Sequence, residues 1–334
     1  MSEPRALTVA EVIRETPDAH SLVFDATPAE LPYRPGQFLT LRLPGGAARC
    51  YSLASSPHDG GRLKVTVKRV PGGRASNWIC DNVTAGTVLE TLPPAGTFTP
   101  RALDTDLLLL AAGSGITPVM SILTSALLAG TGRVTLVYAN RDETSVIFAV
   151  ALRELAAAHP GRLTVVHWLE SVQGLPAEAA LTGLLTGLDG EFAEAFVCGP
   201  AGFMDAATAA LTGLGVARVH TERFRSLAED PFAAPAPVTG ETVARIQVDL
   251  DGAVSEHDWP AEARLLDVLL AAGLDAPFSC REGACSACAC RVVEGEVKML
   301  ANEILDEADL ADGWVLACQS LPLGERVRVT YEED

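Results

Sequence analysis

Four cysteines carry the clearest chemical pattern in this 334-residue chain: Cys280, Cys285, Cys288 and Cys318. Their spacing is C-x4-C-x2-C, followed after 29 residues by the fourth cysteine. This spacing is typical of [2Fe–2S] sites in which one loop supplies three thiolates and a distant segment supplies the fourth. Zinc would favour two separated C-x2-C pairs, and disulfides would favour a small secreted chain. The sequence therefore predicts a [2Fe–2S] cluster, a one-electron centre that needs an electron source.

Two glycine-containing segments could bind phosphate. Residues 113–118 (Gly-Ser-Gly-Ile-Thr-Pro) follow an apolar run and open a helical pattern, so their backbone N–H groups can face a pyrophosphate at the helix N-terminus. A proline stands where the G-x-G-x-x-G dinucleotide fingerprint has its last glycine, and proline is favoured in the first helical turn. Gly72 and Gly73 likewise precede a short helix, with Ser76 as its expected N-cap, although an ordinary glycine turn has the same composition.

Two further segments end strands of a predicted parallel sheet, at the edge where open α/β sheets bind ligands. Cys198, Gly199 and Pro200 end one strand, and Cys198 taken alone is equally a small buried side chain. Arg141 follows another strand and is itself followed by two acidic residues. An arginine can hold a ribose 2′-phosphate and an acid can bind ribose hydroxyls, so the residues leave that choice open.

Three regions with different sequence patterns must position these residues. Short alternating strands with Gly/Pro turns in residues 1–101 predict an antiparallel β-barrel. Apolar strands that alternate with helices in residues 102–225 predict an α/β unit with a parallel sheet. Residues 226–241 are rich in Pro and Ala and predict a linker. Residues 242–334 predict a small α+β unit with a helix against a mixed sheet.

The individual elements are read from periodicity and turn signals. Strands are expected at residues 7–13, 21–24, 37–43, 62–70, 87–91, 107–111, 134–138, 163–168, 195–197, 218–221 and 326–331. Helices are expected near residues 118–128, 146–158, 177–186, 202–214 and 264–272. Hairpins are expected around residues 251–252 and 294–295.

Charge is unevenly distributed along the chain, whose formal net charge is −18. Residues 1–101 hold 11 basic and 9 acidic residues, a net +2; residues 102–241 hold 7 and 15, a net −8; residues 242–334 hold 7 and 19, a net −12. The acidic, cysteine-bearing third argues against nucleic acid, because phosphates need cations. It suits either steering toward a basic protein partner or a simple solvated surface.

The cellular location is read from the same composition. No basic and apolar leader opens the sequence, and no apolar run approaches the ~20 residues that span a bilayer. Eight cysteines without a secretory signal indicate a reducing compartment. We therefore expect a cytoplasmic protein without a membrane partner.

Arg49, Tyr51 and Ser52 form an Arg-x-Tyr-Ser motif that resembles that of the ferredoxin–NADP reductase superfamily. An arginine fork suits a flavin phosphate, a tyrosine face can pack against the flavin ring, and a serine hydroxyl can bond near the flavin N5. With the other motifs, the whole chain resembles a three-domain oxygenase reductase. The resemblance implies an FAD-binding β-barrel (1–101), an NAD(P)-binding α/β domain (102–225) and, after the linker (226–241), a plant-type [2Fe–2S] ferredoxin domain of β-grasp fold (242–334).

The resemblance also implies roles for single residues. Cys198 would lie beside the nicotinamide, and Phe224 would cover the flavin face that the nicotinamide must reach, although an aromatic there could simply fill a core. Ser286 stands where plant-type ferredoxins usually carry glycine, and its hydroxyl could bond a cluster sulfide and alter the potential. The implied cofactor-binding residues are Arg49, Tyr51, Ser52, Gly73, Ser76, Gly113, Gly115, Thr117, Pro118, Arg141, Gly199 and Pro200.

Within the superfamily the chain looks most similar to the reductase components of 3-ketosteroid 9α-hydroxylases. The segments behind this similarity are residues 222–227, 230–232, 316–319 and 329–331. Reductases of phenylacetyl-CoA epoxidases look similar too, so the partner oxygenase stays open between a steroid and an aromatic system. A redox-sensing module without enzymatic activity is the alternative from another class, and a complete flavin site argues against it.

The implied activity is electron transfer from NADH, with NADPH as the alternative, through FAD and the [2Fe–2S] cluster to a terminal oxygenase. The protein would position and tune these groups.

Overall fold

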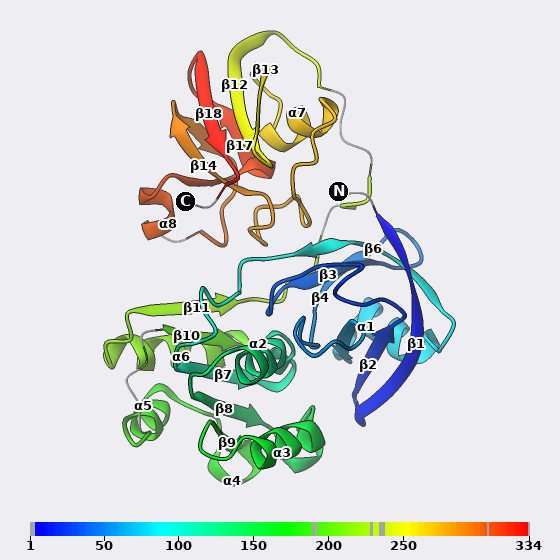
Figure 1. Cartoon of the computed structure of the whole chain (residues 1–334), viewed down its shortest axis with the longest axis vertical. Helices are drawn as coiled ribbons and strands as arrows, with labels where there is room; N and C mark the ends of the chain where they lie inside the picture. The colour runs from blue at the N-terminus through cyan, green and yellow to red at the C-terminus, as the bar shows by residue number, and fades with distance from the viewer. Residues whose placement is uncertain are drawn as a thin grey trace.

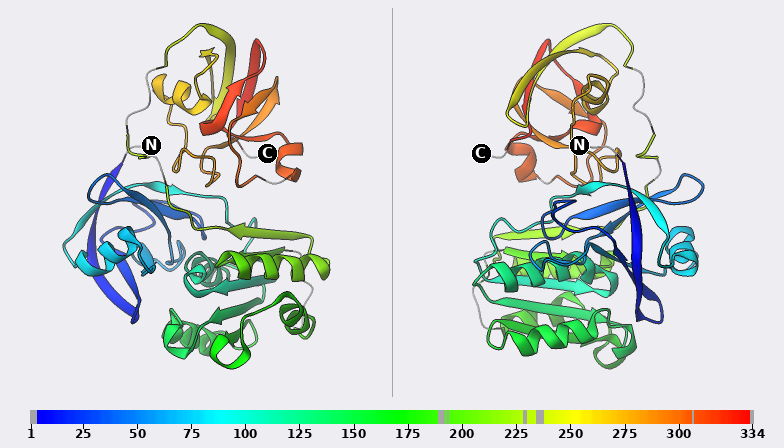
Figure 2. Two further views of the ribbon diagram at one scale, coloured as in Figure 1. Left: turned by 180° about the vertical axis from the view of Figure 1, so that it is seen from behind. Right: turned by 45° about the vertical axis from the view of Figure 1, so that its right-hand side comes forward.

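The computed structural model describes residues 4–188, 192, 194–227, 230–233, 238–305 and 307–332. Three sheets of five or six strands each form the core of one unit, and a two-stranded sheet accompanies the third (Figure 1). The first two units lie side by side and the third sits across them, as all views show (Figure 2). Residues 228–229 and 234–237 of the expected linker lie outside the described residues. Within the described ranges, no helix is both long and apolar enough to cross a bilayer.

The first unit is an antiparallel sheet of six strands in the order β4-β3-β6-β1-β2-β5, which confirms the predicted class. Its elements are β1 (Arg5–Thr16), β2 (Ala19–Phe24), β3 (Phe38–Arg42), β4 (Ala48–Ser52), β5 (Lys64–Lys68), α1 (Arg74–Asn82) and β6 (Val88–Ala95). The sheet curls so far that a bridge between Leu53 and Val65 joins its two edges. Alternate side chains such as Leu39 and Leu41 fill its interior. β4 was not among the expected strands, because its Arg and Cys residues blur the apolar alternation.

The second unit is a five-stranded parallel sheet in the order β11-β10-β7-β8-β9, as predicted. Its strands are β7 (Leu107–Ala112), β8 (Val134–Asn140), β9 (Leu163–Leu169), β10 (Glu194–Cys198) and β11 (Arg218–Glu222). Its helices are α2 (Ile116–Ala129), α3 (Ala149–Ala158), α4 (Glu170–Gln173), α5 (Glu178–Thr186) and α6 (Ala201–Gly213). One apolar cluster joins α2 and α3 to one sheet face, and another joins α5 and α6 to the other face. The central strands β7, β8 and β10 are therefore buried on both faces, which explains their largely apolar sequence.

The strand order decides where this sheet can bind a ligand. The chain moves outward from β7 through β8 to β9, then returns to the other side of β7 with β10 and β11. The carboxyl ends of β7 and β10 therefore flank the topological switch point, where the connections diverge and leave a crevice. The loops that follow these two strands begin at Gly113 and Gly199.

The third unit combines the mixed sheet β13-β12-β18-β14-β16 with the two-stranded sheet β15-β17. Its elements are β12 (Thr242–Leu250), β13 (Ala253–Pro260), α7 (Leu265–Ala271), β14 (Ala289–Glu294), β15 (Val297–Met299), α8 (Glu307–Ala311), β16 (Trp314–Leu316), β17 (Ser320–Pro322) and β18 (Arg326–Thr330). Leu265 and Leu269 of α7 share an apolar cluster with Ile246 and Trp259 of the sheet. The predicted α+β class is confirmed.

The hairpin expected around residues 294–295 is wrong. β14 pairs with β16 and β18, whereas β15 pairs with β17 in a separate sheet. Gly295 has φ +84°, and a Cβ on it would lie 2.3 Å from the carbonyl oxygen of Arg326 in β18. The turn thus crosses close over β18 and leads the chain out of the sheet, so its glycine reflects a close backbone approach.

Candidate functional site

A pocket forms where the first sheet, the end of β11 and the cysteine loop meet. It brings together residues that lie more than 200 positions apart in the sequence. Its lining residues are Phe38, Cys50, Ser52, Glu222, Arg223, Phe224, Arg225, Leu227, Cys280, Ala284 and Cys285. Of the expected catalytic residues, Ser52 and Phe224 therefore share one cavity with two of the expected iron ligands. The side chain of Phe224 is 48% exposed, so it is not a core residue.

β4 divides the Arg-x-Tyr-Ser motif between the two faces of the strand, because side chains alternate. Ser52 is buried at the end of β4 and lines the pocket with Cys50. Tyr51, on the other face, packs against the core of the first unit. The Arg49 guanidinium donates to the carbonyls of Ala48 at 2.6 Å and Leu227 at 3.3 Å. Arg49 thus lies beside the segment that leads into the third unit.

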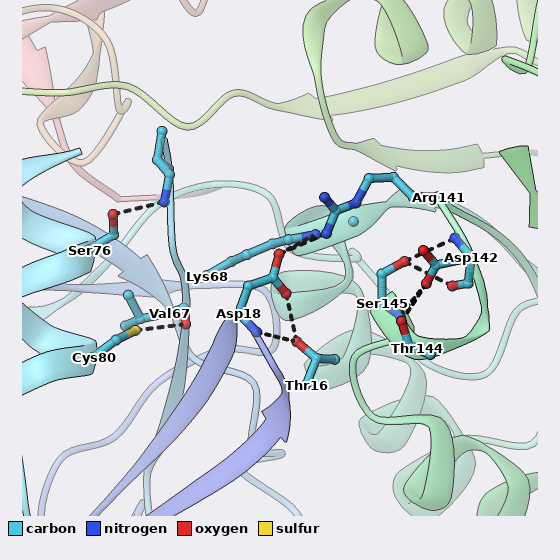
Figure 3. Close-up of polar contacts among 12 residues, drawn as sticks. Thr16, Asp18, Val67, Lys68, Ser76, Cys80, Arg141, Asp142, Thr144 and Ser145 are labelled. Carbon is cyan, nitrogen blue, oxygen red and sulfur yellow. Dashed lines mark hydrogen bonds and ion pairs between the residues drawn. The ribbon is translucent and has the colours of Figure 1, made fainter. Parts of the chain in front are cut away.

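Ser76 does not cap α1. The helix begins at Arg74 with Gly73 as its N-cap, and no side chain hydrogen-bonds to this end. Ser76 lies inside the first turn, where its hydroxyl accepts from the Val70 N–H at 3.1 Å (Figure 3). The hydroxyl therefore closes the turn between β5 and α1. The uncapped helix end still offers backbone N–H groups to an anion.

The two loops at the switch point pack directly on each other. A Cβ on Gly115 would lie 2.0 Å from the carbonyl oxygen of Cys198, and one on Gly199 would lie 2.9 Å from the Ala112 side chain. These glycines are required because any side chain would force the loops apart. Gly113 has φ +54°, a conformation that glycine adopts without strain.

Residues next to these loops lie at the starts of α2 and α6. The Thr117 hydroxyl donates to the Ser114 carbonyl at 3.0 Å, and Pro118 is buried in the first turn of α2. Pro200 is the N-cap residue of α6, and no side chain caps α2 or α6. Cys198 is fully buried, and burial raises the pKa of its thiol well above the usual value. It is therefore a neutral thiol beneath the crevice.

Arg141 faces the first unit. Its guanidinium donates to Asp18 Oδ2 at 2.8 Å, and the Lys68 ammonium lies 4.0 Å from the same oxygen (Figure 3). The Lys68 ammonium also lies beside Gly113, 3.5 Å from where a Cβ would be. Burial lowers the pKa of Lys68, and Asp18 partly opposes that shift. Two cations and one carboxylate thus meet next to the glycine loop.

Asp142, the acidic residue next to Arg141, already accepts hydrogen bonds from its own loop. The Asp142 carboxylate accepts from the Thr144 hydroxyl at 2.7 Å and from the Ser145 N–H at 3.0 Å (Figure 3). These bonds hold the pKa of Asp142 below its usual value. Asp142 therefore caps a turn, and ribose hydroxyls would have to compete with these donors.

The sequence analysis assigned no site role to three residues of the site, Lys68, Asn140 and Glu222, although Glu222 stands in the segment 222–227 that supports the family resemblance. Asn140 ends β8 and is 3% exposed, and neither its side-chain nitrogen nor its oxygen has a hydrogen-bond partner among the described residues. A buried amide without partners costs about 1–3 kcal/mol, which a ligand can recover. Burial raises the pKa of the Glu222 carboxyl in the pocket to about 8. Only their strand-end positions could have indicated these residues.

Backbone N–H groups and thiols converge on Cys280. Its Sγ accepts from the N–H groups of Glu282 at 3.3 Å and Ala284 at 3.4 Å. The Cys285 and Cys318 thiols, together with these amides, lower the pKa of Cys280. Such donors stabilise the thiolate, which is the form that binds iron.

The other three cysteines expected as iron ligands lie in the same hydrogen-bond network. Cys285 Sγ accepts from the Cys280 N–H at 3.3 Å, and Cys288 Sγ accepts from the Cys318 N–H at 3.4 Å. Within the described ranges, no three His, Cys, Asp or Glu side chains are grouped for a single metal ion. A binuclear cluster needs only two thiolates on each iron, so the four cysteines fit a [2Fe–2S] group.

The expected hydrogen bond from Ser286 to a sulfide finds no support in the side-chain geometry. The Ser286 hydroxyl lies 2.7 Å from the Cys285 carbonyl oxygen and 2.7 Å from the Thr97 hydroxyl. Ser286 adopts φ +53°, the region that favours glycine. The serine therefore contacts the first unit rather than the sulfur atoms of the loop.

Family models match all three units in chain order. An oxidoreductase FAD-binding domain matches residues 6–99, an oxidoreductase NAD-binding domain matches residues 109–209, and a 2Fe-2S iron-sulfur cluster binding domain matches residues 248–323.

Two relatives match along nearly their whole length. The chain is 55% identical over 343 residues to the ferredoxin reductase component of 3-ketosteroid-9-alpha-monooxygenase from Mycolicibacterium smegmatis, with 98% of this chain and 97% of the relative covered. It is 35% identical over 367 residues to one of the subunits of 1,2-phenylacetyl-CoA epoxidase from Escherichia coli, with 99% of each covered.

Solved structures share the arrangement. Full-length CYP116B46 from Tepidiphilus thermophilus superposes with a TM-score of 0.68 at 28% identity, over 98% of this chain and 42% of that longer chain. Phthalate dioxygenase reductase, a modular structure for electron transfer from pyridine nucleotides to [2Fe–2S], superposes with a TM-score of 0.56 over 98% of each chain. Its 22% identity shows a shared three-domain fold.

We expect Glu222 to make stability depend on pH. Its carboxyl has a pKa of about 8 in the folded chain against an ordinary value of 4.5, so its contribution is complete below about pH 4.5 and is lost as the pH rises through about 8. Between about pH 6 and pH 9, the free energy of unfolding should therefore fall more in the wild type than in Glu222→Gln, whose amide does not titrate. Denaturant titrations measure the free energy of unfolding of the wild type and the variant at each pH. An equal fall in the two proteins would contradict the raised pKa of Glu222.

We expect Cys318→Ala to lose the cluster and Cys290→Ala to keep it. Both cysteines are buried in the third unit, but the thiol of Cys318 meets those of Cys280 and Cys288, whereas that of Cys290 meets Tyr331. Iron per chain and the visible absorbance of the cluster measure the outcome. Equal iron loss in the two variants would show that any core change in this unit releases iron.

Proposed function

Because the chain belongs to the family of oxygenase reductases with FAD-, NAD- and [2Fe–2S]-binding domains, we propose that it is the reductase component of a 3-ketosteroid 9α-hydroxylase system. It takes electrons from NAD(P)H and passes them to a terminal oxygenase. The steroid system is favoured over the epoxidase system because identity is 55% to the relative from the first system and 35% to that from the second. The proposed domains are residues 1–101, 102–225 and 242–334, joined by the linker 226–241.

The main support for the proposed electron path is the pocket that the flavin-site residues share with the cysteine loop. Ser52 and Phe224 line the same cavity as Cys280 and Cys285, so a flavin held by β4 would lie next to the iron ligands. When bound, FAD converts the two-electron chemistry of NAD(P)H into the one-electron chemistry of the cluster. The chain's own part is to bind, orient and shield these groups.

The flavin would be held by the first unit. Arg49 would bind its phosphate by turning from the Leu227 carbonyl, and Tyr51 would pack against the ring. Ser52 would offer its hydroxyl near the flavin N5. Gly73 and Ser76 shape the uncapped start of α1, where the pyrophosphate would meet backbone N–H groups.

The pyridine nucleotide would occupy the crevice of the second unit. Gly113, Gly115, Thr117 and Pro118 shape the start of α2, and Gly199 and Pro200 shape the start of α6. Cys198 would form the floor beneath the nicotinamide. Phe224 is half exposed, so it can rotate out of the pocket and make room for the nicotinamide.

NADH is the proposed donor, because Arg141 is paired with Asp18 and its charge is partly neutralised. The cytoplasm is the proposed location, since the reaction draws on NAD(P)H and all cysteines are present as thiols among the described residues. The strongly acidic third unit suits a basic surface on the oxygenase.

Two experiments test the proposal. Anaerobic mixing of the holoprotein with NADH should bleach the flavin absorbance before the cluster absorbance, and the reverse order would contradict the electron path. Reconstitution with the oxygenase component of a 3-ketosteroid 9α-hydroxylase should yield hydroxylated steroid. Turnover only with the oxygenase component of a phenylacetyl-CoA epoxidase would replace the steroid assignment by the epoxidase one.

We expect Asp18→Asn to raise the use of NADPH relative to NADH, because it releases the Arg141 guanidinium for a 2′-phosphate. An exposed ion pair contributes about 1 kcal/mol or less, so the ratio of kcat/KM for NADPH to that for NADH should rise up to about fivefold. Asp25→Asn is the matched control, since it removes the same charge from an exposed pair with Arg62. An unchanged ratio in Asp18→Asn would rule out this restraint on Arg141.

A further inference from the structure

Two hydroxyl pairs join the cysteine loop to the first sheet. The Thr40 and Ser279 hydroxyl oxygens lie 2.6 Å apart, and those of Thr97 and Ser286 lie 2.7 Å apart. Thr40 is in β3, and Thr97 follows the neighbouring strand β6. The pairs therefore connect adjacent strands of the first unit to the third unit.

Both loop partners are covalent neighbours of iron ligands. Ser279 directly precedes Cys280, and Ser286 directly follows Cys285. Cys280 and Cys285 are the two ligands that line the pocket shared with Ser52. The two hydroxyl pairs therefore bracket the part of the loop that faces the flavin site.

The two pairs differ in burial. Thr40 and Ser279 are almost completely buried, at 0% and 1% exposure, so no water replaces the bond in the docked arrangement. Their other neighbour is the thiol of Cys50, a weaker partner 3.5 Å from the Thr40 hydroxyl and 4.0 Å from that of Ser279. A buried hydroxyl without a partner is disfavoured, which makes this contact directional. Thr97 is exposed, and its pair with Ser286 lies nearer the rim.

The backbone conformation of Ser286 also indicates a docking role. The residue holds φ +53°, where glycine would be unstrained, and its hydroxyl reaches across to Thr97. The position thus combines a strained backbone with a side chain that contacts the other unit. Strain of this kind persists where the surrounding contacts compensate for it.

Charged contacts between the units lie farther from the cysteines in the chain. Arg225 pairs with Glu303, and both side chains are 44% exposed. Arg42 pairs with Asp230 of the connecting segment at 3.4 Å. The loop already carries the charged residues Arg281 and Glu282, and neutral hydroxyls can hold it without adding a further charge that would shift the cluster potential.

We propose that Thr40–Ser279 and Thr97–Ser286 are positioning pairs that dock the cysteine loop on the flavin-binding sheet and so set the rate of flavin-to-cluster electron transfer. The inference rests on the proposed electron path. Each bond changes the ratio of docked to undocked loop about fivefold, which corresponds to about 1 kcal/mol. Bonds of this strength hold the loop in place and still permit its release.

The test compares Thr40→Val and Thr97→Val, singly and together, with Thr40→Ser and Thr97→Ser, which keep the hydroxyls. In the holoprotein, hydrogen exchange of residues 93–99 and 279–288 should accelerate about fivefold in each Val variant and more than about tenfold in the double variant. Flavin-to-cluster transfer after a single reduction by NADH should slow in the double variant. Iron content, cluster potential and the hydride step should stay at wild-type values, and the Ser variants should behave as the wild type.

Thr66→Val is the matched control, because Thr66 forms a buried hydroxyl pair with Ser21 at 2.7 Å inside the first sheet. Equal effects in Thr66→Val and Thr40→Val would overturn the proposal in favour of a general weakening of the sheet. Wild-type exchange and transfer in the double Val variant would also overturn it. A wild type that NADH does not reduce would overturn the proposed function, whereas hydrogen exchange would still report on docking.

Discussion

The packing of the cysteine loop against the first sheet is the contact on which the rest of the arrangement depends. Cys280 and Cys285 line the same pocket as Ser52, so a flavin and a cluster meet only while the third unit stays docked there. The neighbouring contacts are hydroxyl pairs, and the ion pairs lie elsewhere in the interface. A neutral and modest interface suits a unit that must receive electrons on one side and deliver them to another protein.

The second unit reaches the same pocket through the end of β11, and its own switch-point loops depend on two glycines. Gly115 and Gly199 let the two switch-point loops touch, and Cys198 is fully buried beneath them. β11 runs parallel to β10, so its end at Glu222 lies opposite Cys198, and Glu222 and Phe224 both line the pocket. The proposed nucleotide and flavin sites would therefore be adjacent, because β11 ends between them.

Most elements could be predicted, and the cysteine pattern could be recognised, because their signals are local. Apolar runs, glycine turns and the C-x4-C-x2-C spacing each fix chemistry within a few residues. The predictions were wrong for residues whose contacts are made with a distant segment or with a neighbouring turn. Gly295 looked like a hairpin turn but passes over β18, Ser76 looked like a cap but bonds Val70, and Ser286 looked like a tuning hydroxyl but points to Thr97.

The sequence by itself determined the three unit classes, their order and the residue types able to hold a flavin, a nucleotide and a cluster. Only the tertiary structure decided which of these residues meet. No site role was expected for Lys68, Asn140 and Glu222, and only folding brings Lys68 to Gly113 and Glu222 to Ser52. The reason is physical: burial and unpaired polar atoms arise from packing between distant segments, and a linear pattern records only neighbours along the chain.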